Sequence, residues 1–315
     1  MTDDLRERLA AVRTEVGKAV VGQEAAVSGL IVALLARGHV LLEGVPGVAK
    51  TLLVRSLSAS LALDTTRVQF TPDLMPGDVT GSTVFDAGTG KFDFRPGPVF
   101  TNLLLADEIN RTPPKTQSAL LEAMEERQVT VDGVSRPLPD PFLVAATQNP
   151  VEYEGTYTLP EAQLDRFLMK IVLDLPARDQ EVEVLVRHAG GFDPRDLSQL
   201  QPVLTPEQLR AARAAVRDVR ATDDVLGYVV DLVRGTRSAP SVQLGVSPRG
   251  AAALLAASRA WAWLRGAPAL TPDHVQDMAL PVLRHRIRLR PEAELEGISV
   301  DAVLRSIIAT VQVPL

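Results

Sequence analysis

The stretch LLEGVPGVAKT, residues 41–51, restricts the possible folds of this chain more than any other segment. An apolar run leads into a turn rich in glycine and proline, and a helical apolar pattern begins after Lys50 and Thr51. The spacing Gly44-x4-Ala49-Lys50-Thr51 fits a phosphate-binding loop, although alanine replaces the usual last glycine. Backbone N–H groups and the helix dipole of such a loop bind phosphate oxygens. The alternative is a plain strand-to-helix turn with a solvated lysine.

Five short apolar runs predict a parallel sheet that is buried on both faces, because such strands read as nearly continuous apolar segments. The runs are residues 39–43, 67–70, 102–108, 141–149 and 169–175. Helical patterns separate them, which predicts an α/β fold with right-handed crossovers. We therefore expect a five-stranded αβα P-loop domain over residues 1–190.

Two segments interrupt this pattern and predict inserted β-hairpins. Residues 82–94 alternate between polar and apolar, pass through a glycine-containing turn and alternate again. Residues 128–136 carry Asp-Gly between two short alternating arms, which is a strong hairpin signal. A hairpin on a sheet domain can be inert, or it can be a working loop.

The pattern becomes purely helical after a plausible linker at 189–202. Three helix starts carry a Ser or Thr cap followed by proline, at Thr205, Ser247 and Thr271. We therefore expect a small all-helical domain over residues 196–315.

The composition excludes several classes of protein. The 315 residues include no cysteine, which rules out disulfides and thiol chemistry, and the four histidines lack metal-ligand spacing. A formal net charge of −6 disfavours nucleic-acid binding through the whole surface. The first ten residues lack the order of a secretory signal, and the apolar runs are too short to cross a bilayer. We expect a cytoplasmic protein without a transmembrane segment.

Two acidic residues, Asp107 and Glu108, end the third apolar run. At such a strand end one carboxylate can hold a magnesium shell and the other can activate water. The pair alone is better interpreted as a solvated strand end, but the upstream phosphate loop favours the catalytic interpretation. Asn149 ends the next run and could contact the γ-phosphate or the attacking water. An ordinary Asn-Pro turn is an equally good interpretation of Asn149.

Two arginines are further candidates. Arg166 lies near the end of a short helical segment at 159–167, where a surface ion pair with Glu161 or Asp165 is the alternative. Arg249 occupies the second position of a predicted helix, where a positive charge opposes the helix dipole. That placement indicates an anionic ligand nearby, and a solvated arginine is the alternative.

In chain order, these motifs resemble those of the AAA+ ATPases, specifically the MoxR branch. The matching segments are VVGQE (20–24), GVPGVAKT (44–51), LLLADEIN (103–110), ATQNP (146–150), LPEAQLDRF (159–167) and SPRG (247–250). The resemblance covers nearly the whole chain, and this branch tends to carry alanine at the position of Ala49. It implies a P-loop domain with a helical lid and Mg²⁺-dependent ATP hydrolysis.

The resemblance also implies a role for each matched residue. The catalytic set would be Glu108 as base, Asn149 as sensor 1, Arg166 as the finger acting on a neighbouring subunit, and Arg249 as sensor 2. Thr51 and, through water, Asp107 would hold Mg²⁺. The residues that would bind ATP are Val20, Val21, Gln23, Gly44, Val45, Pro46, Gly47, Val48, Ala49, Lys50, Thr51 and Leu52.

As for partners, the resemblance implies a nucleotide-dependent homo-hexamer that acts as a chaperone-like remodeller. Such proteins mature partner complexes or insert their cofactors, and partners with von Willebrand factor A domains are typical. One alternative is a nucleic-acid motor, for which residues 283–296 are the one candidate basic patch. Its four arginines, at 284–290, are followed directly by three glutamates, at 292–296, so the patch is better interpreted as a solvated, internally paired surface. A nucleotide-gated binding module with little turnover is a third possibility, and intact Glu108 and Arg166 argue against it.

Overall fold

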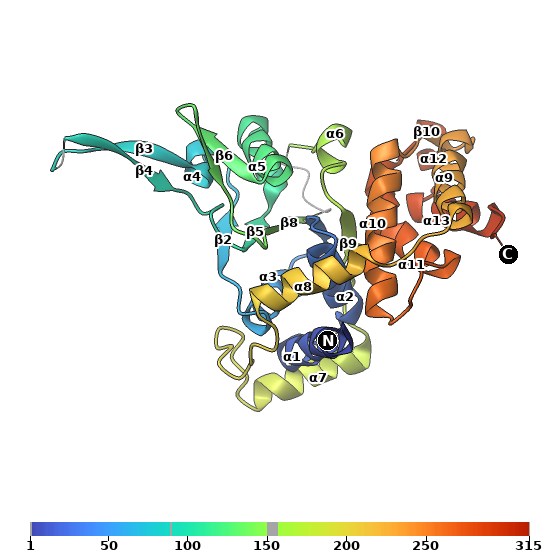
Figure 1. The fold of residues 1–315 in the computed structure, drawn as a ribbon, viewed down its shortest axis with the longest axis horizontal. Coiled ribbons are helices and arrows are strands. Elements are labelled where there is room, and N and C mark those ends of the chain that lie inside the picture. The colour runs from blue at the N-terminus through green and yellow to red at the C-terminus, as the bar shows by residue number, and fades with distance from the viewer. Residues whose placement is uncertain (1, 89, 150–156, 315) are drawn as a thin grey trace.

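The computed structural model describes residues 2–88, 90–149 and 157–314. A five-stranded parallel sheet forms the centre of the N-terminal part, in the order β2-β5-β8-β1-β9 (Figure 1). Its strands are β1 (Val40–Glu43), β2 (Thr65–Gln69), β5 (Leu103–Asp107), β8 (Leu143–Gln148) and β9 (Met169–Val172). The five predicted strands are present, and the predicted α/β class is confirmed.

Successive residues of each strand point to opposite faces of the sheet, so the strands contribute to two separate apolar cores. Leu42 of β1 belongs to the core with helices α1 (Thr2–Ala19), α2 (Glu24–Leu35) and α3 (Lys50–Ser60). Leu41 belongs to the core on the opposite face, with α4 (Pro76–Thr80) and α5 (Pro114–Glu126). Because both faces are covered, the inner strands β1, β5 and β8 are mostly apolar, as predicted. The prediction of a buried strand was wrong for β2, which lies at the edge of the sheet and buries only Val68.

The strand order decides where polar residues meet. β8 lies between β5 and β1, and all three strands run in the same direction. The residues that follow their carboxyl ends therefore gather at one edge of the sheet, which is where ligands bind in open parallel sheets.

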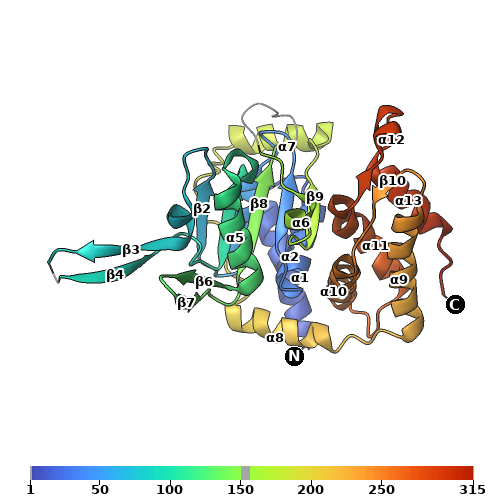
Figure 2. The same ribbon diagram turned by 90° about the horizontal axis from the view of Figure 1, so that it is seen from above.

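Both predicted hairpins are present. The first consists of β3 (Gly81–Asp86) and β4 (Lys91–Pro96), and the second of β6 (Gln128–Val131) and β7 (Val134–Pro137). Figure 2 shows that the first hairpin projects far from the body of the molecule. Thr89, in its predicted turn, lies outside the described residues.

The C-terminal part is helical apart from one short antiparallel pair of strands, β10 (Val242–Leu244) and β11 (Arg288–Leu289). The remaining elements are α6 (Glu161–Leu164), α7 (Arg178–Ala189), α8 (Pro206–Arg217), α9 (Asp223–Ser238), α10 (Pro248–Leu264), α11 (Pro272–Leu283), α12 (Pro291–Leu295), α13 (Val300–Thr310) and the 3-10 turns η1 (Ile109–Arg111) and η2 (Arg284–Arg286). The caps predicted at Thr205, Ser247 and Thr271 precede α8, α10 and α11. The expectation of helices alone missed the small sheet, because strands of two and three residues are too short to produce a periodic pattern.

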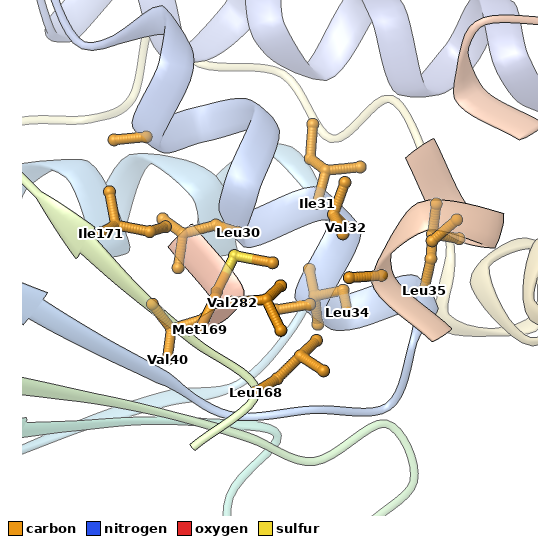
Figure 3. Close-up of a cluster of buried hydrophobic side chains, with 14 of the residues drawn as sticks. Leu30, Ile31, Val32, Leu34, Leu35, Val40, Leu168, Met169, Ile171 and Val282 are labelled. Atoms are coloured by element: carbon orange, nitrogen blue, oxygen red, sulfur yellow. The ribbon is translucent and has the colours of Figure 1, made fainter. Parts of the chain in front are cut away.

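The helical part packs directly on the sheet domain. Figure 3 shows Val282, from α11 of the helical part, beside Leu34 of α2 and Met169 of β9 in the sheet domain. On α8, the buried Arg213 donates to the Leu34 carbonyl at 2.7 Å and pairs with Asp140 at 2.7 Å. The domain boundary at 190–196 stays a prediction. No helix in the described ranges combines the length and apolar character of a membrane span.

Candidate nucleotide-binding site

A cavity of about 760 Å³ opens at the carboxyl edge of the sheet. The predicted residues that line it are Val20, Val21, Gln23, Pro46, Gly47, Val48, Ala49, Lys50, Thr51, Leu52, Asp107, Glu108 and Asn149. They come from four separate parts of the sequence, and the fold brings them together. Gly44 and Val45 belong to the same loop but do not line the cavity wall. The binding roles of all these residues remain predictions.

The loop between β1 and α3 has the backbone of a phosphate cradle. Gly47 has φ of +92°, a conformation that L-residues with a side chain rarely adopt. Ala49 is also left-handed, with φ of 60° and ψ of 24°, directly before the first residue of α3. Glycine would adopt this conformation more easily, which explains why the general pattern has glycine there. Lys50 Nζ donates to the Gly44 carbonyl at 2.6 Å, so its charge lies within the loop.

The acid pair lies beside this loop, at the end of β5. Asp107 has a side chain that is only 12% exposed, and its Oδ2 pairs with Arg67 of β2 at 2.7 Å. Glu108 adopts a left-handed backbone conformation with φ of 58°. Its Oε2 accepts from Gln69 Nε2 at 2.8 Å and pairs with Arg111 at 3.0 Å. Two neighbouring carboxylates thus face the cavity from one strand end.

Thr147 of β8 connects the two acids, although no motif in the sequence indicates a role for it. Its hydroxyl donates to Asp107 Oδ1 at 2.5 Å and accepts from the Glu108 backbone N–H at 2.8 Å. The side chain is fully buried. A threonine in an apolar strand has an ordinary explanation in strand propensity, so the sequence carried no signal for this contact.

Asn149 follows β8 directly and is 5% exposed. It lines the cavity together with Lys50 and Glu108. Its predicted partner in the motif, Pro150, lies outside the described residues. The contact of Asn149 with a terminal phosphate or the attacking water stays a prediction.

The other wall of the cavity comes from α7 and the residues around it, which belong to none of the motifs in the sequence. Leu185 and His188 line it from the helix, and Leu175 and Phe192 line it from either side. Leu185 is 68% exposed although it is apolar. Such a wall offers an apolar surface to the flat face of a nucleobase.

The residues of the cavity fit a nucleotide with Mg²⁺. The Thr51 hydroxyl and the Asp107 carboxylate line the same space, and both are the hard oxygen donors that Mg²⁺ prefers. Lys50 and the N-terminus of α3 supply positive charge and N–H donors for phosphate oxygens.

Arg166 and Arg249 do not line this cavity. They line a second cavity of about 300 Å³, together with Arg37, Arg127 and Arg286. Both share one partner, because Glu125 Oε2 accepts from Arg166 Nε at 2.6 Å and Glu125 Oε1 accepts from Arg249 Nη1 at 3.1 Å. The hydrogen bond from Arg166, above all, lowers the pKa of Glu125. The structure thus gathers the two predicted arginines, but away from the phosphate loop of their own chain.

Comparison with known proteins finds matches to both parts of the chain. Residues 39–169 match the model of the ATPase family associated with various cellular activities (AAA), and residues 234–307 match the AAA lid domain. The chain is 50% identical to the uncharacterised protein YeaC of Bacillus subtilis, over 99% of this chain and 97% of that protein. It is 43% identical to the chaperone MoxR1 of Mycobacterium tuberculosis, over 95% of this chain and 81% of that protein.

The fold has a close counterpart of known structure. A crystal structure of a Cytophaga hutchinsonii protein matches with a TM-score of 0.91 and 40% identity, covering 100% of this chain and 97% of that one. The match therefore extends over both the sheet domain and the helical part. The phosphate loop, the acid pair and the helical lid occur in the order that the family requires, and the chain belongs to the MoxR family of AAA+ ATPases.

Proposed function

We propose that this chain assembles into a homo-hexameric ring and uses ATP hydrolysis to remodel a protein client. One observation carries the proposal: Arg166 and Arg249 lie outside the cavity of their own chain and are bound together through Glu125. A lone chain would therefore have a base and a phosphate loop, but neither of these two arginines would line its own cavity. A second copy, placed with its arginines at the mouth of the cavity, would complete the site.

Within one chain, each residue has a defined task in this proposal. Lys50 neutralises the β- and γ-phosphates, and Thr51 and Asp107 hold the Mg²⁺ that neutralises the transferred charge. Glu108 takes the proton of the attacking water, and Asn149 orients that water or the γ-phosphate. Thr147 keeps the two acids in their relative positions, because its hydroxyl bonds to both.

The two arginines act on the neighbouring subunit. Transfer of the γ-phosphoryl group spreads negative charge over its oxygens, and an arginine that reaches in contributes on the order of 10³–10⁵ in rate. Glu125 binds both guanidinium groups in the isolated chain. The γ-phosphate of the neighbour would compete with Glu125 for the same donors, which links the arginine position to the nucleotide state.

The projecting hairpin supports a protein client. Phe85 and Phe92 are 54% and 72% exposed, and their rings contact each other at a centroid distance of 5.2 Å. Arg136 of the second hairpin lies 3.9 Å from the ring of Phe94, so the two hairpins form one surface. An exposed aromatic pair on a projecting ribbon fits contact with an apolar segment of another protein.

The alternative of a nucleic-acid motor is less well supported. Aromatic rings could stack on bases, but β3 and β4 balance Lys91 and Arg95 against Asp86 and Asp93. A ribbon without net positive charge gains little from phosphate contacts. The finer proposal, that the client is a complex with a von Willebrand factor A domain whose cofactor is inserted or matured in the cytoplasm, rests on membership of the MoxR family.

A mixing experiment tests the shared site. Arg166→Ala should bind ATP and barely hydrolyse it, because the neighbouring site lacks its arginine. Glu108→Gln should also bind ATP and barely hydrolyse it, because its own site lacks the base. Mixed rings place an intact Glu108 pocket beside an intact Arg166, so two inactive variants reassembled together should regain part of the activity. Recovery should peak near equal amounts. If rings shown to be mixed stay inactive while the wild type hydrolyses without cooperativity, Arg166 does not act on its neighbour.

A further inference from the structure

Asp165, directly before Arg166, is held by two residues of the helical part of the chain. Its Oδ1 accepts from Arg286 Nε at 2.6 Å, and its Oδ2 accepts from the Ser247 hydroxyl at 3.2 Å. Both oxygens of the carboxylate are thus occupied. The side chain is 22% exposed, which leaves the ion pair only partly screened by water.

Arg286 fixes the backbone of the same segment. Its side chain is only 3% exposed, and it donates to the carbonyls of Asp165 at 3.2 Å, Phe167 at 2.6 Å and Leu168 at 3.1 Å, and also to that of Val282. Burial lowers the pKa of this guanidinium, and the charge of Asp165 opposes that shift. One arginine therefore binds the carbonyls of the residues before and after Arg166. These bonds fix the backbone at Arg166 and so the direction in which its side chain points.

The start of α10 is tied to the same point. Ser247 caps α10 by accepting from the Gly250 N–H at 3.3 Å, and its hydroxyl donates to Asp165. Arg249 is the second residue of this helix. A Cβ atom at Gly250 would lie 2.9 Å from Cδ of Arg286 and 2.4 Å from Cγ1 of Val246, so a side chain at position 250 would displace Arg286.

We infer that Asp165 and Arg286 form a positioning pair that aims Arg166 and Arg249 together at the neighbouring subunit's nucleotide. This inference rests on the proposed function, and it adds two residues that line the second cavity beside Arg166 and Arg249. The pair joins the Arg166 segment to the lid, so the two arginines move as one body. Glu125 then binds or releases both arginines at once.

Loss of the pair should mimic loss of Arg166 in part. Asp165→Asn keeps the shape and removes the charge that orients Arg286, and displacement of a catalytic group by about 1 Å costs about 10²-fold in rate. We expect kcat to fall by about 10- to 100-fold, with KM and ATP affinity changed less than about threefold. Gly250→Ala should act in the same direction from the opposite side of Arg286, and Arg286→Lys should leave more activity than Arg286→Ala.

Asp301→Asn is the matched control. Asp301 pairs with Arg284 at 2.9 Å in the same region, and the Arg284 side chain is 15% exposed, but neither residue contacts the Arg166 segment in any described interaction. This variant should lose similar stability and keep its kcat. The comparison separates weakening of the lid from misplacement of the arginines.

Two further readouts exclude a purely structural role. In an Arg166→Ala background, Asp165→Asn should lower kcat no further, because the group that it positions is already absent. Rings that mix Asp165→Asn with Glu108→Gln should regain activity, because the Asp165→Asn protomer keeps an intact pocket of its own. Rates are measured by steady-state phosphate release, ATP affinity by calorimetry, and folding by circular dichroism.

The outcomes of these experiments distinguish failure of the inference from failure of the proposed function. A normal kcat in both Asp165→Asn and Gly250→Ala, with Arg166→Ala inactive, overturns the inference and leaves the proposed function intact. Loss of ATP binding, or failure of the mixed rings to recover while Arg166→Ala mixtures do recover, means that the pair only supports the fold and also overturns it. A fully active Arg166→Ala overturns both the inference and the proposed function. If Asp165→Asn does not fold, Gly250→Ala and Arg286→Lys decide by the same criteria.

Discussion

Thr147→Val tests the contact that joins the two acids. Valine keeps the shape of the buried side chain and removes the hydroxyl that bonds to Asp107 and to the Glu108 N–H. A buried N–H left without an acceptor costs about 1–3 kcal/mol, and a lost hydrogen bond to a charged group costs about 1.5–3 kcal/mol. Arg67 still pairs with Asp107 in the variant, and the new methyl group is buried. We therefore expect a net loss of about 2–4 kcal/mol.

This loss should be visible in stability and in rate. At about 2 °C per kcal/mol for a chain of this size, the Tm should fall by roughly 4–8 °C. The left-handed Glu108 also loses the bond that fixes its backbone, so kcat should fall by about 10²-fold while ATP still binds. Differential scanning calorimetry gives the Tm, and steady-state phosphate release gives kcat.

Thr147→Ser is the matched control, since it keeps the hydroxyl and removes one methyl group. It should lose about 1 kcal/mol from the small cavity and keep a near-normal kcat. If Thr147→Val has the Tm and kcat of the wild type, the hydroxyl neither stabilises the acid pair nor positions Glu108. If the serine and valine variants lose activity equally, packing rather than hydrogen bonding explains the effect.

Four further predictions concern other parts of the molecule. Lys50→Ala removes the cation that neutralises the phosphates, so ATP binding should be lost, and unchanged binding by calorimetry would contradict the phosphate loop. Glu108→Gln should keep ATP binding and lower hydrolysis by about 10²–10⁴, and near-normal turnover would place water activation elsewhere. Replacing Phe85 and Phe92 with serine should abolish stimulation of the ATPase by its client, and equal loss of the unstimulated rate would make the hairpin structural. Burial lowers the pKa of His39 to about 4, so the unfolded chain binds a proton below about pH 6.5 that the folded chain does not. The free energy of unfolding should therefore fall by about 3 kcal/mol as the pH falls from about 6.5 to 4. If the free energy of unfolding of His39→Gln depends on pH as steeply as that of the wild type, this prediction is refuted.

The sequence alone determined the features that depend on short stretches of chain. The phosphate loop was readable because glycine, lysine and threonine at this spacing, between a strand and a helix, are typical of a loop that binds phosphate. The inner strands of the sheet were readable as apolar runs, and the helix starts at Thr205, Ser247 and Thr271 as caps. Each of these signals is contained within about ten residues, so it can be read from the local order of residue types alone.

The tertiary structure alone decided which distant side chains meet. Thr147 lies 40 residues from Asp107 in sequence, and Arg286 lies 121 residues from Asp165, so no local pattern could pair them. The sequence named Arg166 and Arg249 but could not place them together on Glu125, away from the phosphate loop of their own chain. Their meeting depends on the direction in which α10 and η2 pack against the segment before β9. That direction is fixed by burial across the whole interface, which is a property of the complete fold rather than of any short segment.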